Sequence, residues 1–138
     1  MATTVLSGAS GALYYKPAGT SSTFAPAGVN IATDTITVPT YLGYRVGDPV
    51  NFSLVNTTTG AAGTGTLPAG LATATTYYVI SYTASTGAMQ VSATEGGAAV
   101  DLTDVGTAAS PNKFQVAYDA FVVVGQVREW AFEMSRAE

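Results

Sequence analysis

The chain has 138 residues and a formal net charge of −4, and 10% of its residues are charged while 47% are hydrophobic. It contains no cysteine and no histidine, which excludes disulfides, thiolate nucleophiles, Cys/His zinc sites and mechanisms with a histidine base. Five basic residues are too few for a surface that grips nucleic-acid phosphates. We therefore expect one domain whose uncharged surface is covered by neighbours in an assembly, without enzymatic activity, metal or cofactor.

The N-terminal region, residues 1–28, is predicted to contain one strand and a linker. Its first residues lack a basic cluster followed by a long apolar run, so no signal peptide is expected, and no apolar run in the chain is long enough for a membrane span. The short, mainly apolar segment 12–16 lies between turn-forming residues and reads as one strand. Prolines and glycines then predict a loop or linker over residues 17–28.

Residues 29–118 are predicted to form an inserted β-rich module. Alternation of apolar and polar residues recurs there, which means that one face of each strand packs while the other is polar. The segments that alternate or are rich in β-forming residues are 35–38, 50–55, 77–82, 89–94 and 113–118. Glycine-containing turns at 84–87 and 95–97 predict hairpins, the second leading into a strand over 98–102. The predicted fold class is all-β, a small sandwich or barrel of short antiparallel strands joined by tight turns.

The C-terminal region, residues 119–138, fits two patterns. At helical spacing one face would hold Val123, Val127, Trp130 and Met134. At strand spacing Trp130, Phe132 and Met134 share one face, and Glu129 and Glu133 share the other. The run of valines and the central glycine favour the strand, which we expect to pair with the N-terminal segment.

Candidate chemistry is sparse. Asp101 and Asp104 could share a calcium ion with Glu95, but their spacing lacks the dense pattern of a calcium loop, and we interpret them as solvated turn residues. The eight tyrosines could form a sugar-stacking platform, although tyrosine is common in strands and interfaces, so we favour core or subunit contacts. The isolated arginines, among them Arg45, are interpreted as partners in surface or interface ion pairs.

Two segments of the chain resemble the tail tube, or major tail, proteins of long-tailed bacteriophages. Residues 5–15 resemble the family's N-terminal Gly-x-x-Gly element, which leads into a first strand. Residues 124–138 resemble its next element, a strand with a tryptophan followed by a Ser-Arg turn. Residues 29–118 between them resemble a β-rich module of phage virion proteins, with landmarks at residues 46–50, 67–71, 77–80 and 92–97.

This resemblance implies a virion structural protein made in the host cytoplasm and located in the tail. Its subunits would form stacked hexameric rings around a channel, with DNA only as passing cargo. On the strand interpretation Glu129 and Glu133 would face this lumen, where acidic side chains repel phosphates, while the opposite face with Trp130, Phe132 and Met134 would pack inward.

The family continues beyond the Ser-Arg turn with strands that close its tube-forming sheet, whereas the printed sequence stops at Glu138. A fragment of a tail tube protein and a different virion protein with the same modules both fit this observation. A capsid decoration protein is therefore the second interpretation. A carbohydrate-binding adhesion module is a third, and a hydrolase that uses only carboxylates is a fourth.

Overall fold

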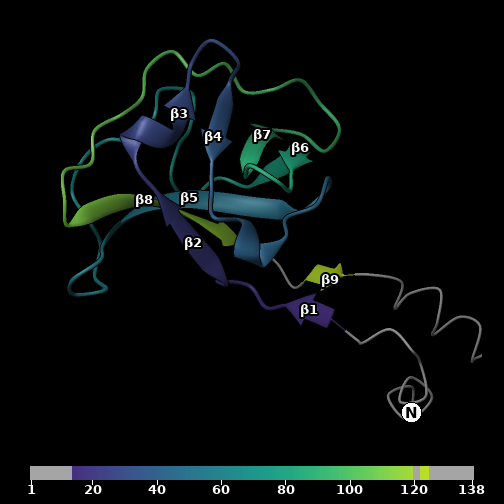
Figure 1. Cartoon of the computed structure of the whole chain (residues 1–138), viewed down its shortest axis with the longest axis horizontal. Helices are drawn as coiled ribbons and strands as arrows, with labels where there is room; N and C mark the ends of the chain where they lie inside the picture. Colours follow the sequence, from purple (N-terminus) through teal and green to yellow (C-terminus); the bar gives the residue numbers. More distant parts are fainter. Residues whose placement is uncertain (1–13, 120–121, 125–138) are drawn as a thin grey trace, which may run out of the picture.

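The computed structural model describes residues 14–119 and 122–124 (Figure 1). Nine strands provide the regular structure of this part of the chain, and its helical elements are two single 3-10 turns, η1 (Pro26–Gly28) and η2 (Thr40–Leu42). The strands are β1 (Tyr14–Lys16), β2 (Ser21–Phe24), β3 (Val29–Asn30), β4 (Thr35–Thr37), β5 (Pro49–Asn56), β6 (Tyr77–Thr83), β7 (Ala88–Ser92), β8 (Asn112–Tyr118) and β9 (Val122–Val124). The prediction of an all-β fold is confirmed.

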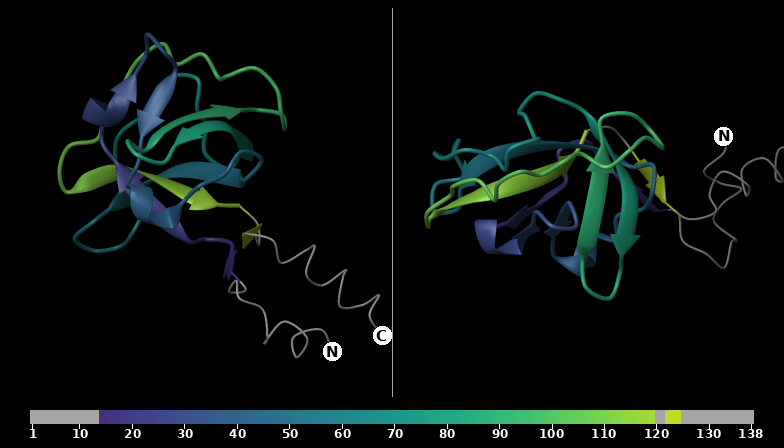
Figure 2. Two further views of the ribbon diagram at one scale, coloured as in Figure 1. Left: turned by 45° about the vertical axis from the view of Figure 1, so that its right-hand side comes forward. Right: turned by 90° about the horizontal axis from the view of Figure 1, so that it is seen from above.

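Seven strands form one antiparallel sheet in the order β2-β8-β5-β6-β7-β4-β3. β5 meets β6 only at Pro49↔Tyr78 and Val50↔Tyr77, whereas it pairs with β8 continuously from Val50 to Asn56. The sheet therefore folds over at the short β5–β6 contact into two layers, β2-β8-β5 and β6-β7-β4-β3. Strands of the two layers cross steeply when the molecule is seen from above (Figure 2), which is the arrangement of a small sandwich.

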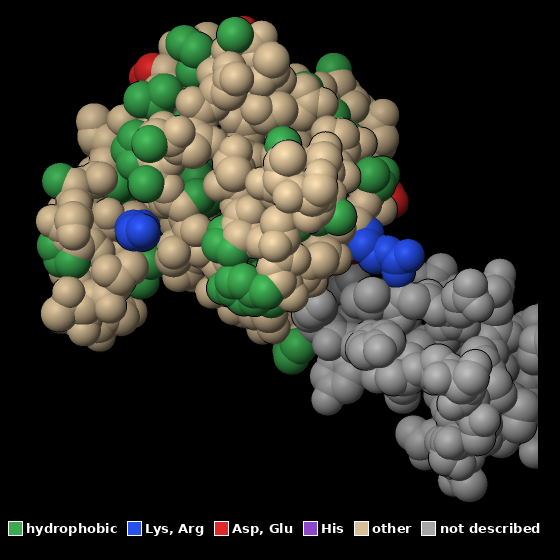
Figure 3. All heavy atoms as spheres, in the orientation of Figure 1, with side chains coloured by type: hydrophobic (Ala, Val, Ile, Leu, Met, Phe, Trp, Pro, Cys, Tyr) green, Lys and Arg blue, Asp and Glu red, His purple; other side chains and the backbone are tan. Residues whose placement is uncertain are grey.

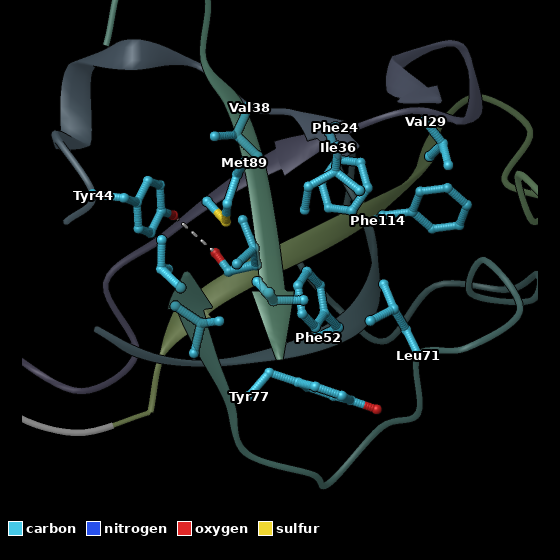
Figure 4. Packing of buried hydrophobic residues seen from close by; sticks show 14 of the residues in the cluster. Phe24, Val29, Ile36, Val38, Tyr44, Phe52, Leu71, Tyr77, Met89 and Phe114 are labelled. Carbon is cyan, nitrogen blue, oxygen red and sulfur yellow. Dashed lines mark hydrogen bonds between the residues drawn. The ribbon is translucent and has the colours of Figure 1, made fainter. Parts of the chain in front are cut away.

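The hydrophobic core lies between the two layers (Figure 4). Val50 and Phe52 of β5 and Phe114 and Val116 of β8 are each at most 1% exposed, and Met89 of β7 meets them from the other layer. Inward and outward side chains alternate along these strands, as the sequence pattern predicts. The rest of the core cluster consists of Phe24, Val29, Ile36, Val38, Leu42, Tyr44, Leu71, Tyr77, Val79, Val91, Leu102 and Tyr118.

The linker predicted over residues 17–28 is wrong for its middle part. β2 lies within it and pairs with β8 from Ser21↔Ala117 to Phe24↔Phe114. Phe24 is 5% exposed, and its ring centroid lies 5.2 Å from that of Phe114. Four residues between turn-rich segments are too short for alternation to be visible in the sequence, because this strand depends on its pairing with β8.

The strand predicted over residues 98–102 is also wrong, because this segment is a loop. The segment runs beside β7 at one point, where the Val100 N–H donates a hydrogen bond of 2.8 Å to the Val91 carbonyl oxygen. No continuous strand pairing follows from this single bond. Leu102 is nevertheless buried, and its N–H donates to Asp34 Oδ1 at 2.9 Å. Leu102 therefore covers the core as part of a loop, without belonging to a strand.

β1 and β9 form a separate two-stranded antiparallel sheet beside the sandwich, which we call the β1–β9 ribbon. Tyr14 lies opposite Val124, and Lys16 lies opposite Val122. β1 leads into the sandwich and β9 follows its last strand, so the chain enters and leaves the sandwich at one place (Figures 1 and 2).

Candidate functional site

The five C-terminal residues singled out by the sequence, Glu129, Trp130, Phe132, Glu133 and Met134, lie outside the described residues. Their assignment to a lumen face and a packing face stays a prediction. β9, which the structure does describe, ends five residues before Glu129.

The three acidic residues considered for a calcium site have different surroundings in the structure. Asp104 Oδ1 accepts hydrogen bonds from the backbone N–H groups of Ala69 (3.0 Å) and Gly106 (2.8 Å), so this carboxylate joins two loops. Asp101 and Glu95 are exposed. Within residues 14–119 and 122–124, no group of three or more acidic, histidine or cysteine side chains is placed to hold a metal ion.

Among residues 17–119, the tyrosines do not gather into an exposed platform. Tyr44, Tyr77 and Tyr118 belong to the core and are 3%, 4% and 1% exposed. Tyr41, in contrast, is 72% exposed. Burial of these three rings agrees with the interpretation of tyrosine as a core residue, whereas Tyr41 is exposed to solvent.

A cluster of tyrosines lies where the sandwich meets the β1–β9 ribbon, and we call it the tyrosine cluster. The ring of Tyr44 stacks on that of Tyr118, with centroids 5.0 Å apart, and meets the edge of Tyr82 at 5.9 Å. The hydroxyl groups of Tyr44 and Ser22 share a hydrogen bond of 3.0 Å, and Ser22 is 3% exposed. β2, β6, β8 and the loop before β5 are thereby joined at this end of the sandwich.

Asp48 completes the polar part of this cluster. It is 6% exposed, and its Oδ2 accepts a hydrogen bond of 2.9 Å from the Arg45 N–H. Burial raises the pKa of Tyr118, and the nearby Asp48 carboxylate raises it further. Burial also raises the pKa of Tyr44 to about 12, so both phenols stay neutral at physiological pH. The two phenols of Tyr44 and Tyr118 therefore support this end of the sandwich as uncharged groups.

Asp119 secures the chain between β8 and the ribbon. Its carboxylate accepts hydrogen bonds from the Thr76 hydroxyl and from Asn51 Nδ2, the latter at 2.6 Å. The bond from Thr76, followed by that from Asn51, lowers the pKa of Asp119. The ribbon therefore begins from a fixed point on the sandwich.

The loop over residues 39–47, between β4 and β5, carries the most exposed large hydrophobic side chains of the described residues. Tyr41 is 72% and Val46 is 67% exposed, and Arg45 beside Val46 is exposed as well. Sequence reasoning did not single out this surface. Its only sequence signal was the presence of four large apolar residues in a segment that also contains one proline and two glycines.

The comparisons give no known protein with which this site can be compared. A scan against family models, a search of curated proteins and a search of solved structures each return no significant match to this chain. Among the described residues, no helix has the length and apolar character that crossing a membrane requires.

Proposed function

We propose that the protein is a phage virion structural protein, and specifically a tail tube subunit that assembles into stacked rings around a DNA conduit. The observation that carries the proposal is the pairing of β1 with β9, Tyr14 opposite Val124. A domain whose chain enters and leaves side by side can be inserted into another sheet without disturbing it. The segments beyond this ribbon, residues 1–13 and 125–138, are the ones that carry most of the resemblance to the tail tube family.

In this proposal the sandwich is an appendage, and the flanking segments belong to the tube wall. Glu129 and Glu133 face the channel and repel DNA phosphates, while Trp130, Phe132 and Met134 pack into the wall. The low charge of the sandwich supports an assembled protein. Charged side chains are few and scattered on the face that Figure 3 shows, and apolar atoms are spread between polar ones.

Electron microscopy of the purified full chain tests this proposal. A tail tube subunit gives stacked rings or tubes of constant width. Discrete trimers would instead support a capsid decoration protein. Monomers that bind glycans on an array would support an adhesion module, for which the strongly exposed Tyr41 is the candidate stacking residue among residues 17–119.

The assignment of the lumen has its own test in assembled virions. Glu129→Lys combined with Glu133→Lys should leave tubes intact but slow DNA ejection, because positive side chains would hold the passing duplex. The matched control, Gln at both positions, removes the negative charges without adding positive ones and should impair ejection far less. Equal ejection by the Lys pair and the wild type would contradict the placement of these residues in the channel.

A further inference from the structure

We propose that the Arg45–Val46 bond is a processing site for a protease of the trypsin class, and that the sandwich stays whole after the cut. Such a protease adds water across the bond, which leaves a carboxylate on Arg45 and a free amino group on Val46. Enzymes of this class hold the lysine or arginine before the cut in an acidic pocket. The inference does not depend on the proposed tube, since it concerns the sandwich alone.

The basic residues are few, and this limits where such a protease can cut. Within residues 14–119 and 122–124 they are Lys16, Arg45 and Lys113. Lys16 is followed by Pro17, and a bond to the tertiary proline nitrogen resists this class of protease. Lys113 lies in β8, between β2 and β5 in the sheet, and the next residue, Phe114, is 0% exposed. Cleavage needs local opening of the backbone, which pairing in a central strand opposes.

Arg45 differs from these two residues because it lies in the loop between β4 and β5. Arg45 is exposed, and Val46 after it is 67% exposed. Exposed loops are the preferred places for proteolytic nicking, since their backbone opens without loss of the core. The bond between these two residues is therefore the accessible one among those that follow a basic residue in the described part of the chain.

A turn controls access to this bond. The Asp48 N–H donates to the Arg45 carbonyl oxygen at 3.1 Å, and the Arg45 N–H donates to Asp48 Oδ2 at 2.9 Å. The Gly47 N–H donates to the Val79 carbonyl oxygen at 2.7 Å. Gly47 has a φ of 98°, which glycine adopts at the third position of a type II turn. The protease therefore cuts the open form of the turn, and the rate follows the fraction of molecules in that form.

Strand pairing keeps the two pieces together after the cut. The first piece contains β1 to β4, and the second contains β5 to β9. β1 pairs with β9, β2 with β8, and β4 with β7, so each of these pairings joins one piece to the other. The first piece also supplies Phe24, Ile36 and Val38 to the core. Processing therefore creates two chain ends at one loop without releasing the sandwich from the ribbon.

Limited digestion of the full chain with trypsin tests the inference. The first product from the described part should be a piece that ends at Arg45, and cuts after Arg128 or Arg136 leave its mass unchanged. Both pieces should elute together from a sizing column and separate in urea. A first cut after Lys16 or Lys113, pieces that separate without urea, or resistance at Arg45 under conditions that cut the urea-unfolded chain would overturn the inference.

Two substitutions at the bond identify the site. Val46→Pro places a proline directly after Arg45 and should abolish the product that ends there. The melting temperature should stay close to that of the wild type, because proline is favoured at the second position of a type II turn. Val46→Ala is the matched control and should be cut at the wild-type rate. Equal rates of cleavage after Arg45 in the two variants would contradict the assignment.

A pair of glycine variants separates local opening from global unfolding. Gly47→Ala strains the turn at its positive φ, while the added Cβ would meet only Glu95 Oε2, at 3.8 Å. Cleavage after Arg45 should become about tenfold faster, because the strained turn opens more often. Gly60→Ala brings a similar strain to the loop after β5 (φ 77°) and should leave the rate within about twofold. Equal acceleration in both variants would mean that trypsin cuts the unfolded chain, and the inference would fail.

Discussion

The two ends of the sandwich are both made of loops, but different interactions hold them together. At the ribbon end, residues 39–48 and 119, the loops are held by buried aromatic rings and by Asp48. At the far end, residues 57–70 and 101–111, two long loops are joined through their backbones. Thr66 and Thr107 exchange two N–H···O=C bonds of 3.0 and 2.8 Å, and their hydroxyls share a further bond of 3.0 Å.

This difference has a consequence for what each end can present. Loops that pair through their backbones must approach closely, so small residues are needed at the points of contact and few side chains can project there. Loops that rest on buried rings keep their outer side free. The ribbon end can therefore carry Tyr41 and Val46 in a fixed position, whereas the far end serves to close the core.

The largest expected effect tests the close approach at the far end. Gly65 has a φ of 132°, and a Cβ there would collide with the Thr107 carbonyl oxygen and touch Leu54. Gly65→Ala should lower the free energy of unfolding by about 3 kcal/mol, from backbone strain and overpacking together. Denaturation in urea measures this.

Gly60 is the matched control for this change. It also has a positive φ, 77°, but a Cβ added to it would meet no other atom within 4 Å. Gly60→Ala should therefore cost only the conformational strain, about 1–2 kcal/mol. Equal losses at the two positions would mean that the far end does not depend on backbone contact.

Much of the sandwich was predictable because apolar and polar residues alternate along several of its longer strands. β5, β7 and β8 each contain two or three buried residues at every second position, such as Val50 and Phe52. β2 was not predictable, since its four residues gain their strand character from β8. The pairing of Thr66 with Thr107 joins residues 41 positions apart, and threonine at either position carries no sign of its partner.

The ribbon end shows a different limit. Asp48 stands in a Gly-Asp-Pro sequence, which is typical of an exposed turn, and the turn prediction gives no reason to expect its burial. The burial follows from Tyr44 and Tyr118, which tertiary folding brings to the same place. The exposure of Tyr41 and Val46 could not be predicted either, because the local sequence pattern of a loop does not distinguish an apolar residue that points inward from one that points outward.

The next effect in size tests the support at the ribbon end. Tyr44→Phe removes the hydroxyl that bonds Ser22, and Ser22 would then be a buried hydroxyl without this partner. The free energy of unfolding should fall by about 1–3 kcal/mol. Adding Ser22→Ala to Tyr44→Phe should recover part of the loss, and a double-mutant cycle gives the coupling between the two side chains. A simple sum of the two single effects would contradict the bond's role.

The tyrosine cluster also predicts how stability depends on alkaline pH. The pKa of Tyr44 rises from 10.0 to about 12 on folding. Below pH 10 the phenol is protonated in both states, so its contribution is fully present; between pH 10 and 12 the unfolded state loses the proton first. Stability should therefore fall by up to about 1.4 kcal/mol per pH unit in this window. Tyr44→Phe should make this fall shallower, and an unchanged slope would contradict it.

A smaller effect tests the side-chain contacts of the far end. Asp104→Ala removes the acceptor of the Ala69 and Gly106 N–H groups and should cost about 1–2 kcal/mol. Asp104→Asn keeps Oδ1 and should stay within about 0.5 kcal/mol of the wild type. Asp101→Ala is the control, because Asp101 is exposed and its side chain should contribute little. A similar loss from both alanine variants would show that charge, rather than the two hydrogen bonds, joins these loops.

The smallest effect has the opposite sign and concerns the same cluster as Tyr44. The Tyr82 hydroxyl is buried and has no hydrogen-bond partner in the described structure, while its ring packs edge-on against Tyr44. Tyr82→Phe keeps the ring and removes an oxygen that lost its water on folding, so the free energy of unfolding should stay level or rise by up to about 1 kcal/mol. Urea denaturation of Tyr82→Phe and Tyr44→Phe side by side then separates the two hydroxyls of adjacent rings. A loss in Tyr82→Phe as large as that in Tyr44→Phe would mean that Tyr82 bonds a partner in the assembled protein, and the ribbon end would then be supported through both hydroxyls.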